Sequence, residues 1–330
     1  MATAPTSPPR VCIVSPALAD ANNGNWHTAS RWQRFLAPVC EVDVRSEWHA
    51  DAEGTVLIAL HARRSADSID RFRQRWPDGP LALVLTGTDL YRDLRTDARA
   101  RHSLECASRV VVLQERGLDK LDPASRMRAC VIVQSAPAVL AERQPGDADF
   151  VAVGHLRPEK DPQTLWDAAR LLAGDARPPT IAHLGGALDA ALGDAARATM
   201  ASCPAYRWLG AQSHAKTRRI LAGAGALVHP SRIEGGANVV IEAVRSRVPV
   251  LASRIDGNVG LLGADYDGYF AAGDAAALAT LMRRFVADAG FAAHLSAQCA
   301  LREPLFRPAA ERRAVRALVL DLVTASNLRH

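Results

Sequence analysis

The sequence predicts an α/β protein with two doubly wound domains, and three observations lead to this fold class. The chain has 330 residues, of which 48% are hydrophobic and 23% charged, so it is long enough and mixed enough for two ordinary domains. Short runs of β-branched residues alternate with amphipathic stretches, a pattern typical of parallel sheets with crossover helices. A stretch rich in Pro, Gly and Asp, residues 137–149, separates two such series.

The first series predicts an N-terminal domain over residues 10–147. Residues 1–9, rich in Pro, Ser and Thr, are expected to form a flexible tail ahead of it. Short apolar runs bounded by turn residues are typical of buried strands. Such runs occur at Arg10–Ser15, Val56–Leu60, Leu81–Leu85, Arg109–Leu113 and Cys130–Gln134.

The second series predicts a C-terminal domain over residues 148–307 by the same pattern. Residues 308–323 are rich in Ala, Arg and Leu at helical spacing. By analogy with other two-domain enzymes, we expect a C-terminal helix over residues 308–330 that packs back on the first domain. The expected strands of the second domain are Phe150–Val153, Thr180–Leu184, Tyr206–Leu209, Ala226–His229 and Val250–Ala252.

The bulk composition argues against several classes of protein. The net charge is +5, but the Lys and Arg residues are scattered and balanced by acids, so we expect no nucleic-acid partner. The six cysteines lie far apart without a C-x-x-C pair, which favours reduced thiols. No apolar run approaches the roughly 18 residues that span a bilayer, and the N-terminal residues lack a signal-peptide pattern. We therefore expect a cytoplasmic enzyme that acts on anionic ligands and has no membrane partner.

One loop of the second domain has the features of an anion-binding site. The strand Ala226–His229 runs into a loop that contains Glu234, Gly235 and Gly236, and a helix follows near Val239. The N–H groups and positive dipole end of such a helix suit a diphosphate, and the two glycines let backbone approach a ligand.

Glu242 lies on the same helix among five apolar neighbours, so its carboxylate needs a partner. The two hydroxyls of a ribose could both donate to it. The alternative is that Glu242 caps a neighbouring helix or pairs with an Arg, and that the glycines serve only a turn.

Two further strand ends of this domain favour the ligand-binding interpretation. The segment after the first strand places His155, Arg157 and Lys160 beside a glycine, as a diphosphate cradle would. Glycines also follow the second and third strands, at Gly185 and after Trp208.

The first domain places Arg and His residues at the expected carboxyl ends of its strands, the edge where ligands bind in open α/β sheets. Few aromatic residues accompany them, which favours a small anionic acceptor over a sugar or lipid. For each residue alone, the alternative is a solvated charge on a loop. The candidates are Gly24, Asn25, His27 and Arg31 after the first strand, His61, Arg63 and Arg64 after the second, and Thr86, Gly87, Thr88, Asp89 and Arg92 after the third.

The order of motifs in the second domain resembles that of the retaining GT-B glycosyltransferases. The motifs are G-x-L-x-x-x-K, then L-G-G, then a strand ending in L-G, then P-S-x-x-E-G-G-x-x-x-x-x-E-A followed by P-V-x-A-S. The resemblance implies a GT-B fold, in which two Rossmann-like domains face a cleft. It also implies that Glu234 contacts donor-sugar hydroxyls and that Glu242 holds the ribose.

The same resemblance implies roles for the rest of the donor site. Lys160 would bind the donor diphosphate together with a residue at the family's G-R-L arginine position, which is His155 here, with Arg157 two residues further on. Gly24 and Asn25 resemble the glycine loop that closes on the donor phosphates, and the backbone around Trp208 would meet uracil. The other expected donor contacts are Gly185, Gly235, Gly236, Ala237 and Asn238.

Five strings together are similar to the selenosugar synthases of selenoneine biosynthesis: N-N-G-N-W-H-T-A, L-H-A-R-R-S, L-T-G-T-D-L-Y-R-D, V-G-H-L-R-P-E-K-D-P and H-P-S-R-I-E-G-G-A-N-V-V-I-E-A. This family transfers a sugar from UDP-N-acetylglucosamine or UDP-glucose to selenophosphate, with release of UDP and phosphate. The resemblance implies functional links to a selenophosphate synthetase and to a downstream selenoneine synthase. The expected acceptor contacts are His27, Arg31, His61, Arg64, Thr86, Gly87, Thr88 and Arg92, and the expected catalytic residues are Glu234, His61 and Asp89.

We expect no cofactor and no metal. Two D-x-D strings, at 147–149 and 265–267, could suggest a metal-bound donor, but one lies in the predicted linker and the other in a late loop. Three alternatives stay open: a glycosyltransferase with a hydroxyl acceptor, a UDP-sugar epimerase of the same fold, and a non-catalytic sugar-nucleotide sensor.

Overall fold

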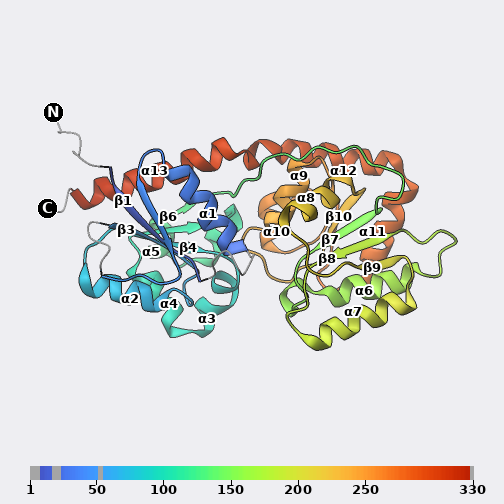
Figure 1. Cartoon of the computed structure of the whole chain (residues 1–330), viewed down its shortest axis with the longest axis horizontal. Coiled ribbons are helices and arrows are strands. Elements are labelled where there is room, and N and C mark those ends of the chain that lie inside the picture. Colours follow the sequence, from blue (N-terminus) through green and yellow to red (C-terminus); the bar gives the residue numbers. More distant parts are fainter. Residues whose placement is uncertain (1–7, 17–23, 51–54, 328–330) are drawn as a thin grey trace. The chain divides into compact units, whose positions relative to one another are not determined.

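The computed structural model describes residues 8–16, 24–50 and 55–327, which form two compact units (Figure 1). Unit 1 comprises residues 1–134 and 308–330, and unit 2 comprises residues 135–307. Most of the expected N-terminal tail, and the residues Asn22 and Asn23 of the first-strand loop, lie outside the described residues. Residues 135–147 pack with unit 2, where Arg245 Nε donates to the carbonyl of Ala136 at 2.9 Å.

The described residues of unit 1 contain a six-stranded parallel sheet in the order β2-β1-β3-β4-β5-β6. Four of the expected strands lie within a residue of their predicted bounds. The fifth, β6, ends at Val131, three residues before its predicted end. The edge strand β2 was not predicted, because its E-V-D-V-R sequence has no apolar run. The strands are β1 Arg10–Val14, β2 Glu41–Arg45, β3 Thr55–Leu60, β4 Leu81–Leu85, β5 Arg109–Val112 and β6 Ala129–Val131.

Helices cover both faces of this sheet. On one face, Trp32 of α1 packs with Val315 and Leu322 of α13 against the sheet. On the other, Phe72 of α2 and Leu104 of α4 fill a second core cluster. The elements are α1 Gly24–Leu36, α2 Ala66–Arg75, a π-helical turn at Asp89–Asp93, α3 Leu94–Thr96, α4 Ala98–Cys106, a 3-10 turn at Glu115–Lys120, α5 Pro123–Met127 and α13 Pro308–Asn327.

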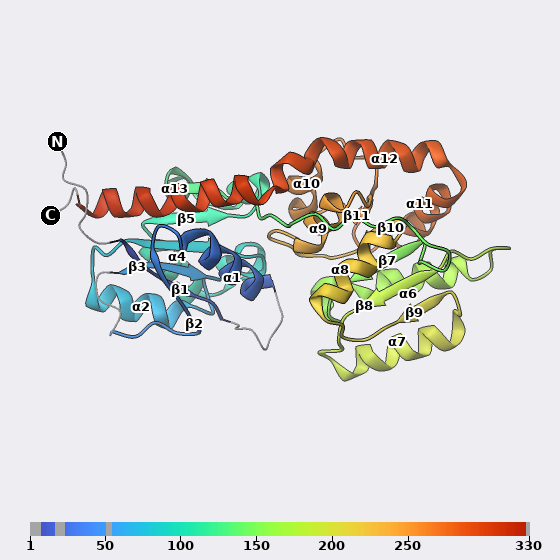
Figure 2. The ribbon, with the colours of Figure 1, turned by 45° about the horizontal axis from the view of Figure 1, so that its top comes forward.

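The C-terminal helix α13 packs on unit 1, as predicted (Figure 2). Its buried Glu311 receives hydrogen bonds from Arg31 Nε and Trp32 Nε1 of α1, both at 2.7 Å. These two charge-assisted bonds join segments that are 280 and 279 residues apart in the chain.

The described residues of unit 2 also contain a six-stranded parallel sheet, in the order β12-β11-β10-β7-β8-β9. All five expected strands are present, and the short edge strand β12 was not predicted. The strands are β7 Phe150–Val153, β8 Ile181–Leu184, β9 Tyr206–Trp208, β10 Ala226–His229, β11 Val250–Ser253 and β12 Tyr269–Phe270. The helices are α6 Pro162–Leu172, α7 Ala190–Ser202, α8 His214–Gly223, α9 Asn238–Arg245, α10 Asp256–Leu262, α11 Ala275–Ala287 and α12 Ala289–Arg302, with 3-10 turns at Pro158–Lys160 and Glu303–Phe306.

Both sheets are doubly wound, as predicted, and each has a point where the strand order reverses. In unit 2 the order reverses between β7 and β10, and in unit 1 between β1 and β3. Ligands of open α/β sheets bind beyond the carboxyl ends of the strands at this point. The loops after β7 and β10 are therefore the first place to look for a site in unit 2.

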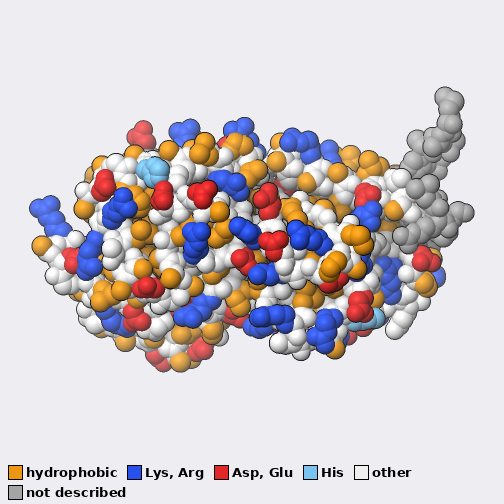
Figure 3. Space-filling view, turned by 180° about the vertical axis from the view of Figure 1, so that it is seen from behind, with side chains coloured by type: hydrophobic (Ala, Val, Ile, Leu, Met, Phe, Trp, Pro, Cys, Tyr) orange, Lys and Arg blue, Asp and Glu red, His pale blue; other side chains and the backbone are white. Residues whose placement is uncertain are grey.

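The described helices include none that is long and apolar enough to cross a membrane. The face shown in Figure 3 carries Lys and Arg side chains interspersed with Asp and Glu.

Candidate functional site

The loops after β7 and β10 bring Lys160 and Glu234 together at the switch point of unit 2. Lys160 ends the 3-10 turn that follows β7, and its Nζ donates to Glu234 Oε1. His229, the last residue of β10, lies behind the carboxylate, with Nε2 3.3 Å from the same oxygen. All three side chains are largely buried, with exposed fractions of 20% for Lys160, 11% for Glu234 and 2% for His229.

The electrostatics of this cluster keep Glu234 ionised. Burial by itself raises the pKa of Glu234, but the charge of Lys160 and the adjacent His229 ring outweigh it and hold the pKa well below its usual range. Burial lowers the pKa of His229 in spite of the nearby carboxylate, so the imidazole is neutral at pH 7. The cluster thus presents a buried carboxylate that can accept hydrogen bonds.

The strand ends of β7 and β8 are packed backbone against backbone. Gly185 has φ 146°, and a Cβ at this position would lie 1.9 Å from the carbonyl oxygen of Gly154. Trp208 Nε1 donates to the Gly185 carbonyl at 2.8 Å, and Gly186 N donates to His155 Nδ1 at 3.1 Å. The glycines predicted from the sequence therefore serve close contact between loops, and the His155 ring is held in one orientation.

Arg157 differs from His155 in having an unsatisfied donor. Its Nε is buried and has no hydrogen-bond partner among the described residues, whereas His155 Nδ1 already accepts from Gly186. A buried guanidinium nitrogen without a partner is costly, and an anionic ligand would satisfy it. Of the two residues that could occupy the arginine position, Arg157 has the unused donor.

Helix α9 begins at Asn238 and has no side-chain cap among the described residues. Its first turn follows Gly235, Gly236 and Ala237, so the positive end of the helix dipole and the N–H groups at its start can meet an anion. The loop is fixed from the far side, because a Cβ on Gly257 would lie only 2.2 Å from the Glu234 carbonyl oxygen.

Glu242 has protein partners from α8. His214 Nε2 lies 2.7 Å from Glu242 Oε1, and Arg218 Nε lies 3.8 Å from it. The structure thus supplies the Arg partner that the sequence left open as an alternative to a ribose, and adds a His. Neither partner was predicted, although His214 and Arg218 are spaced i, i+4 and so share one face of α8.

The loops after β3 and β4 of unit 1 are tied together by Asp89. Its side chain is fully buried and accepts backbone N–H groups from Thr86 at 2.9 Å, Gly87 at 2.8 Å and Ala62 at 3.0 Å. These bonds use both carboxylate oxygens. They give the expected catalytic Asp89 a loop-organising role that the sequence did not predict.

His61 lies in the same group with backbone φ 74°, a left-handed conformation that costs energy outside glycine. Its Nε2 is 3.1 Å from Thr88 Oγ1, and its Nδ1 accepts from Arg64 N at 3.4 Å. Burial lowers the pKa of His61, and Asp89 only partly offsets this effect. The imidazole is therefore neutral at pH 7.

Three arginines come from the same two loops as this histidine. Arg63 Nε lies 3.1 Å from Asp93 Oδ2, and Arg92 Nε donates to Asp93 Oδ1 at 3.0 Å. Arg64 is exposed and has no ion pair among the described residues. Asp93 is 97% buried and was not predicted, although it follows Asp89 by four residues on the same turn.

Residues at the start of α1 make hydrogen bonds within unit 1. Arg31 NH1 donates to the carbonyl of His27 at 3.3 Å while its Nε binds Glu311, so the expected acceptor residue Arg31 is engaged in packing α13. Thr28 Oγ1 donates to the Gly24 carbonyl at 2.8 Å, and Asn25 is half-buried in the same turn.

Three of the four carboxylates of the two D-x-D strings have partners within unit 2. Asp147 accepts from Gln144 N at 2.7 Å, Asp149 from Thr180 N at 2.9 Å, and Asp267 lies 2.7 Å from His294 Nε2. Within the part of the chain that the structure describes, no three His, Cys, Asp or Glu side chains converge in a way that could hold a metal ion.

Comparison with known proteins agrees with this architecture. The family of group 1 glycosyl transferases matches residues 141–300, most of unit 2. Similar solved structures include HepE of Anabaena in complex with UDP and glucose, with 13% identity over 94% of this chain and 99% of that chain and a TM-score of 0.76. Sucrose-phosphate synthase of Thermosynechococcus elongatus has 16% identity over 96% of this chain and 100% of that chain, also with a TM-score of 0.76. No curated protein matches.

The chain therefore has the GT-B fold, as the sequence predicted. Residues 141–300 match the group 1 glycosyl transferases, and the solved structures share the fold of the whole chain.

Proposed function

We propose that this GT-B protein is a group 1 glycosyltransferase that takes its sugar from a UDP-sugar. The observation that carries the proposal is the cluster of Lys160, Glu234 and His229 at the switch point of unit 2. HepE binds UDP and glucose in one structure and UDP-glucose in another, which supports a UDP-sugar donor here.

The donor diphosphate would lie between three sources of positive potential. Lys160 can turn from Glu234 to a phosphate oxygen, Arg157 can use its unpaired Nε, and the uncapped start of α9 offers N–H groups. These groups stabilise charge that develops on the leaving diphosphate, which is the largest contribution a glycosyltransferase of this kind can make. Glu234, released from Lys160, would accept hydrogen bonds from sugar hydroxyls.

The acceptor we propose is selenophosphate, as the resemblance of the sequence implies. The arginines at positions 63, 64 and 92 beside a neutral His61 suit a small anion. Selenium attacks the anomeric carbon, a C–Se bond forms, and the C–O bond to the diphosphate breaks as UDP leaves. Water then cleaves the P–Se bond, so the products are a 1-selenosugar, UDP and phosphate. Selenophosphate is already anionic, so the attack needs little help from a general base.

An assay with two readouts tests this function. The purified chain is incubated with UDP-N-acetylglucosamine or UDP-glucose and selenophosphate, and UDP and the selenosugar are measured by mass spectrometry. Stoichiometric release of UDP with selenosugar formation is the expected result. UDP release only with a hydroxyl acceptor would overturn the selenium assignment. Conversion of the donor without UDP release would indicate an epimerase, and UDP binding without turnover a sensor.

A further inference from the structure

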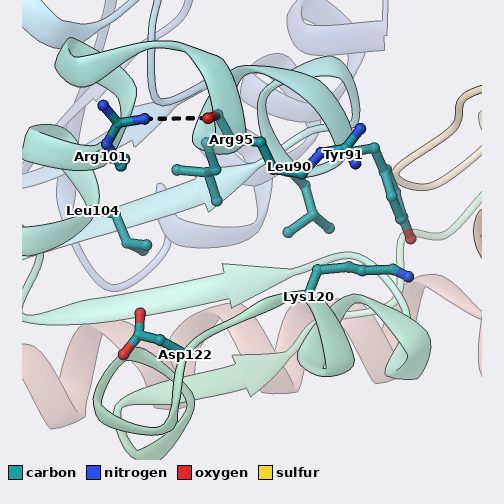
Figure 4. Close-up of a pocket in the computed structure, with 8 residues that line it drawn as sticks. Leu90, Tyr91, Arg95, Arg101, Leu104, Lys120 and Asp122 are labelled. Carbon is teal, nitrogen blue, oxygen red and sulfur yellow. Dashed lines mark hydrogen bonds between the residues drawn. The ribbon is translucent and has the colours of Figure 1, made fainter.

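A pocket of about 390 Å³ lies in unit 1 beside the π-helical turn Asp89–Asp93 (Figure 4). Its lining mixes arginine and lysine side chains with the carboxylate of Asp122, so its charge selects no class of ligand. Arg232 and Asp161, which join the loops after β7 and β10 of unit 2, form a more specific arrangement.

Arg232, in the loop after β10, is bonded to both neighbours of Lys160 in the chain. Its backbone N–H donates to the carbonyl of Glu159 at 2.9 Å, and its side-chain Nε donates to Asp161 Oδ2 at 2.9 Å. Glu234, which contacts Lys160, lies two residues further along the same loop. One segment of chain therefore holds the residues on either side of Lys160 and also supplies the carboxylate that its ammonium meets.

Asp161 is a fixed partner for this arginine. Its side chain is only 5% exposed, and Thr164 Oγ1 of α6 donates to the same Oδ2 at 2.6 Å. Its backbone has φ 46°, a left-handed conformation that Asp and Asn adopt more readily than most residues. Because a buried carboxylate needs hydrogen bonds or a cation, Asp161 holds the side chain of Arg232 in one place.

The guanidinium of Arg232 also lies against the loop after β12. At Gly273, which has φ 87°, a Cβ would lie 3.1 Å from the guanidinium. The side chain of Arg232 is thus placed by two loops besides its own, although it is 57% exposed.

Lys160 lies on a short turn that benefits from such support. The 3-10 turn Pro158–Lys160 has three residues and ends at the left-handed Asp161, and 3-10 turns have poorer hydrogen-bond geometry than α-helices. The stem of the Lys160 side chain packs on Gly154, where a Cβ would lie 3.4 Å from Cγ and Cδ. This contact guides the stem, whereas the two bonds from Arg232 set where the backbone of the turn lies relative to Glu234.

We propose that Arg232, held by Asp161, is a positioning residue that keeps Lys160 at the place where it meets the donor diphosphate. This role rests on the proposed function, because Lys160 acts there on the phosphates of UDP. The attraction between an ammonium and a phosphate falls as the distance between them grows, so a turn that can shift binds the nucleotide less tightly. Arg232 thus contributes to UDP binding through Lys160 and not by contact with the nucleotide.

A double-mutant cycle on the full chain tests this role by calorimetric titration with UDP. The proteins are the wild-type chain, Arg232→Met, Lys160→Ala and the variant with both changes. We expect Arg232→Met to raise the Kd for UDP about fivefold, because the ammonium of Lys160 is no longer held in place. The variant with both changes should bind UDP as Lys160→Ala does, because a residue that acts through Lys160 has no effect once Lys160 is gone.

The matched control is an ion pair at the other end of α6. Arg283 Nε donates to Asp175 Oδ2 at 2.8 Å, and Asp175 lies three residues after the last residue of that helix. Arg283 is 44% exposed, which is similar to Arg232. Arg283→Met should therefore leave the Kd for UDP unchanged.

A conservative variant of the anchor tests the same contact from the other side. Asp161→Asn keeps an oxygen that can accept from Arg232 Nε, and Asn also tolerates the left-handed conformation. We expect it to raise the Kd for UDP less than about twofold. A larger loss than that of Arg232→Met would contradict the hydrogen bond as the means by which Asp161 acts.

Circular dichroism melting confirms that each variant is folded at the temperature of the titration. If Arg232→Met is not, Arg232→Lys, which keeps the charge and loses the Nε donor, takes its place in the cycle with the same expectation. Arg232→Met binding UDP as tightly as Arg283→Met, or a further loss of affinity when it is added to Lys160→Ala, would overturn the positioning role alone. A wild-type chain that does not bind UDP would overturn the proposed function and this role with it.

Discussion

At Glu234, a buried carboxylate stays ionised because Lys160 lies against it and His229 lies behind it. This arrangement makes the carboxylate a hydrogen-bond acceptor, and its proton cannot be used in acid catalysis near neutral pH. The ion pair with Lys160 also means that both residues must be released from each other when a ligand with phosphates and hydroxyls binds.

Glu234→Gln removes the charge and keeps the shape of the side chain. We expect kcat for UDP release to fall about 100-fold, because the amide accepts fewer hydrogen bonds from sugar hydroxyls and no longer balances the positive charge of Lys160. The Kd for UDP should change less than threefold. Steady-state kinetics and calorimetry measure the two quantities. The control is Glu142→Gln at an exposed position, and equal kcat values for the two variants would contradict the role of Glu234.

Arg157→Ala tests which residue occupies the arginine position. We expect the Kd for UDP to rise about tenfold, because the buried Nε loses a phosphate partner, and His155→Ala to have a smaller effect. Calorimetric titration with UDP measures both. The larger effect at His155 would show that the orphaned Nε of Arg157 has no ligand-binding role.

Burial of His183 predicts how stability depends on pH. Its Nδ1 lies 2.9 Å from the Tyr206 hydroxyl, and burial lowers the pKa of His183 to about 4. The unfolded state therefore binds a proton below about pH 6.5 that the folded state refuses until about pH 4, so stability falls as the pH falls through this window. His61 and His229, whose pKa values are also lowered by burial, act in the same direction.

Urea unfolding at pH 7 and pH 5 measures this effect. We expect the free energy of unfolding to be about 2 kcal/mol lower at pH 5 from His183 alone. His183→Gln should show a smaller difference between the two pH values. A wild-type chain that is equally stable at both would rule out a buried, neutral His183.

At the scale of elements, the inner strands of each sheet could be predicted from the sequence. The contacts that each element makes with distant parts of the chain could not. The runs at Leu81–Leu85 and Ala226–His229 were predicted to the residue because buried parallel strands are continuously apolar. The edge strand β2 is half-exposed and carries alternating charges, so it has no such signal. The sequence does not show that this segment lies at the edge of the sheet, because only the fold determines its position.

The same limit applies to the candidate site. The strand-end rule identified the loops that hold Lys160, Glu234 and His61. It could not show that α8 would bring His214 to Glu242, or that Glu311 of α13 would take the guanidinium of Arg31. Both partners come from elements that are distant in sequence, and an isolated motif contains no signal for them.

Helix α13 offers a matched pair of ion-pair variants. Glu311 is buried against Arg31 and Trp32, whereas Asp321 pairs with Arg109 at the surface, with Nε 2.6 Å from Oδ2. We expect Glu311→Ala to lower the free energy of unfolding by about 3–5 kcal/mol, because it leaves a buried guanidinium unpaired. Asp321→Ala should cost less than about 1 kcal/mol. Denaturant unfolding compares them, and similar losses would contradict the anchoring role of Glu311.

At the scale of the whole molecule, each unit carries its own doubly wound sheet and its own group of polar residues at a strand-order reversal. Under the proposed function, unit 2 recognises the phosphates and hydroxyls of the donor, and the loops of unit 1 that hold the neutral His61 receive the acceptor. The motifs of unit 2 gave more specific predictions than those of unit 1, since its glycines include Gly185 and Gly257, where backbone packing leaves no room for a side chain.

The most direct test of the central claim is calorimetric titration of the full chain with UDP. We expect a single site in the wild-type chain and a Kd at least tenfold higher in Lys160→Ala, with Glu142→Gln unchanged. Absence of UDP binding in the wild-type chain, or equal affinity in all three proteins, would contradict a nucleotide site at the switch point of unit 2.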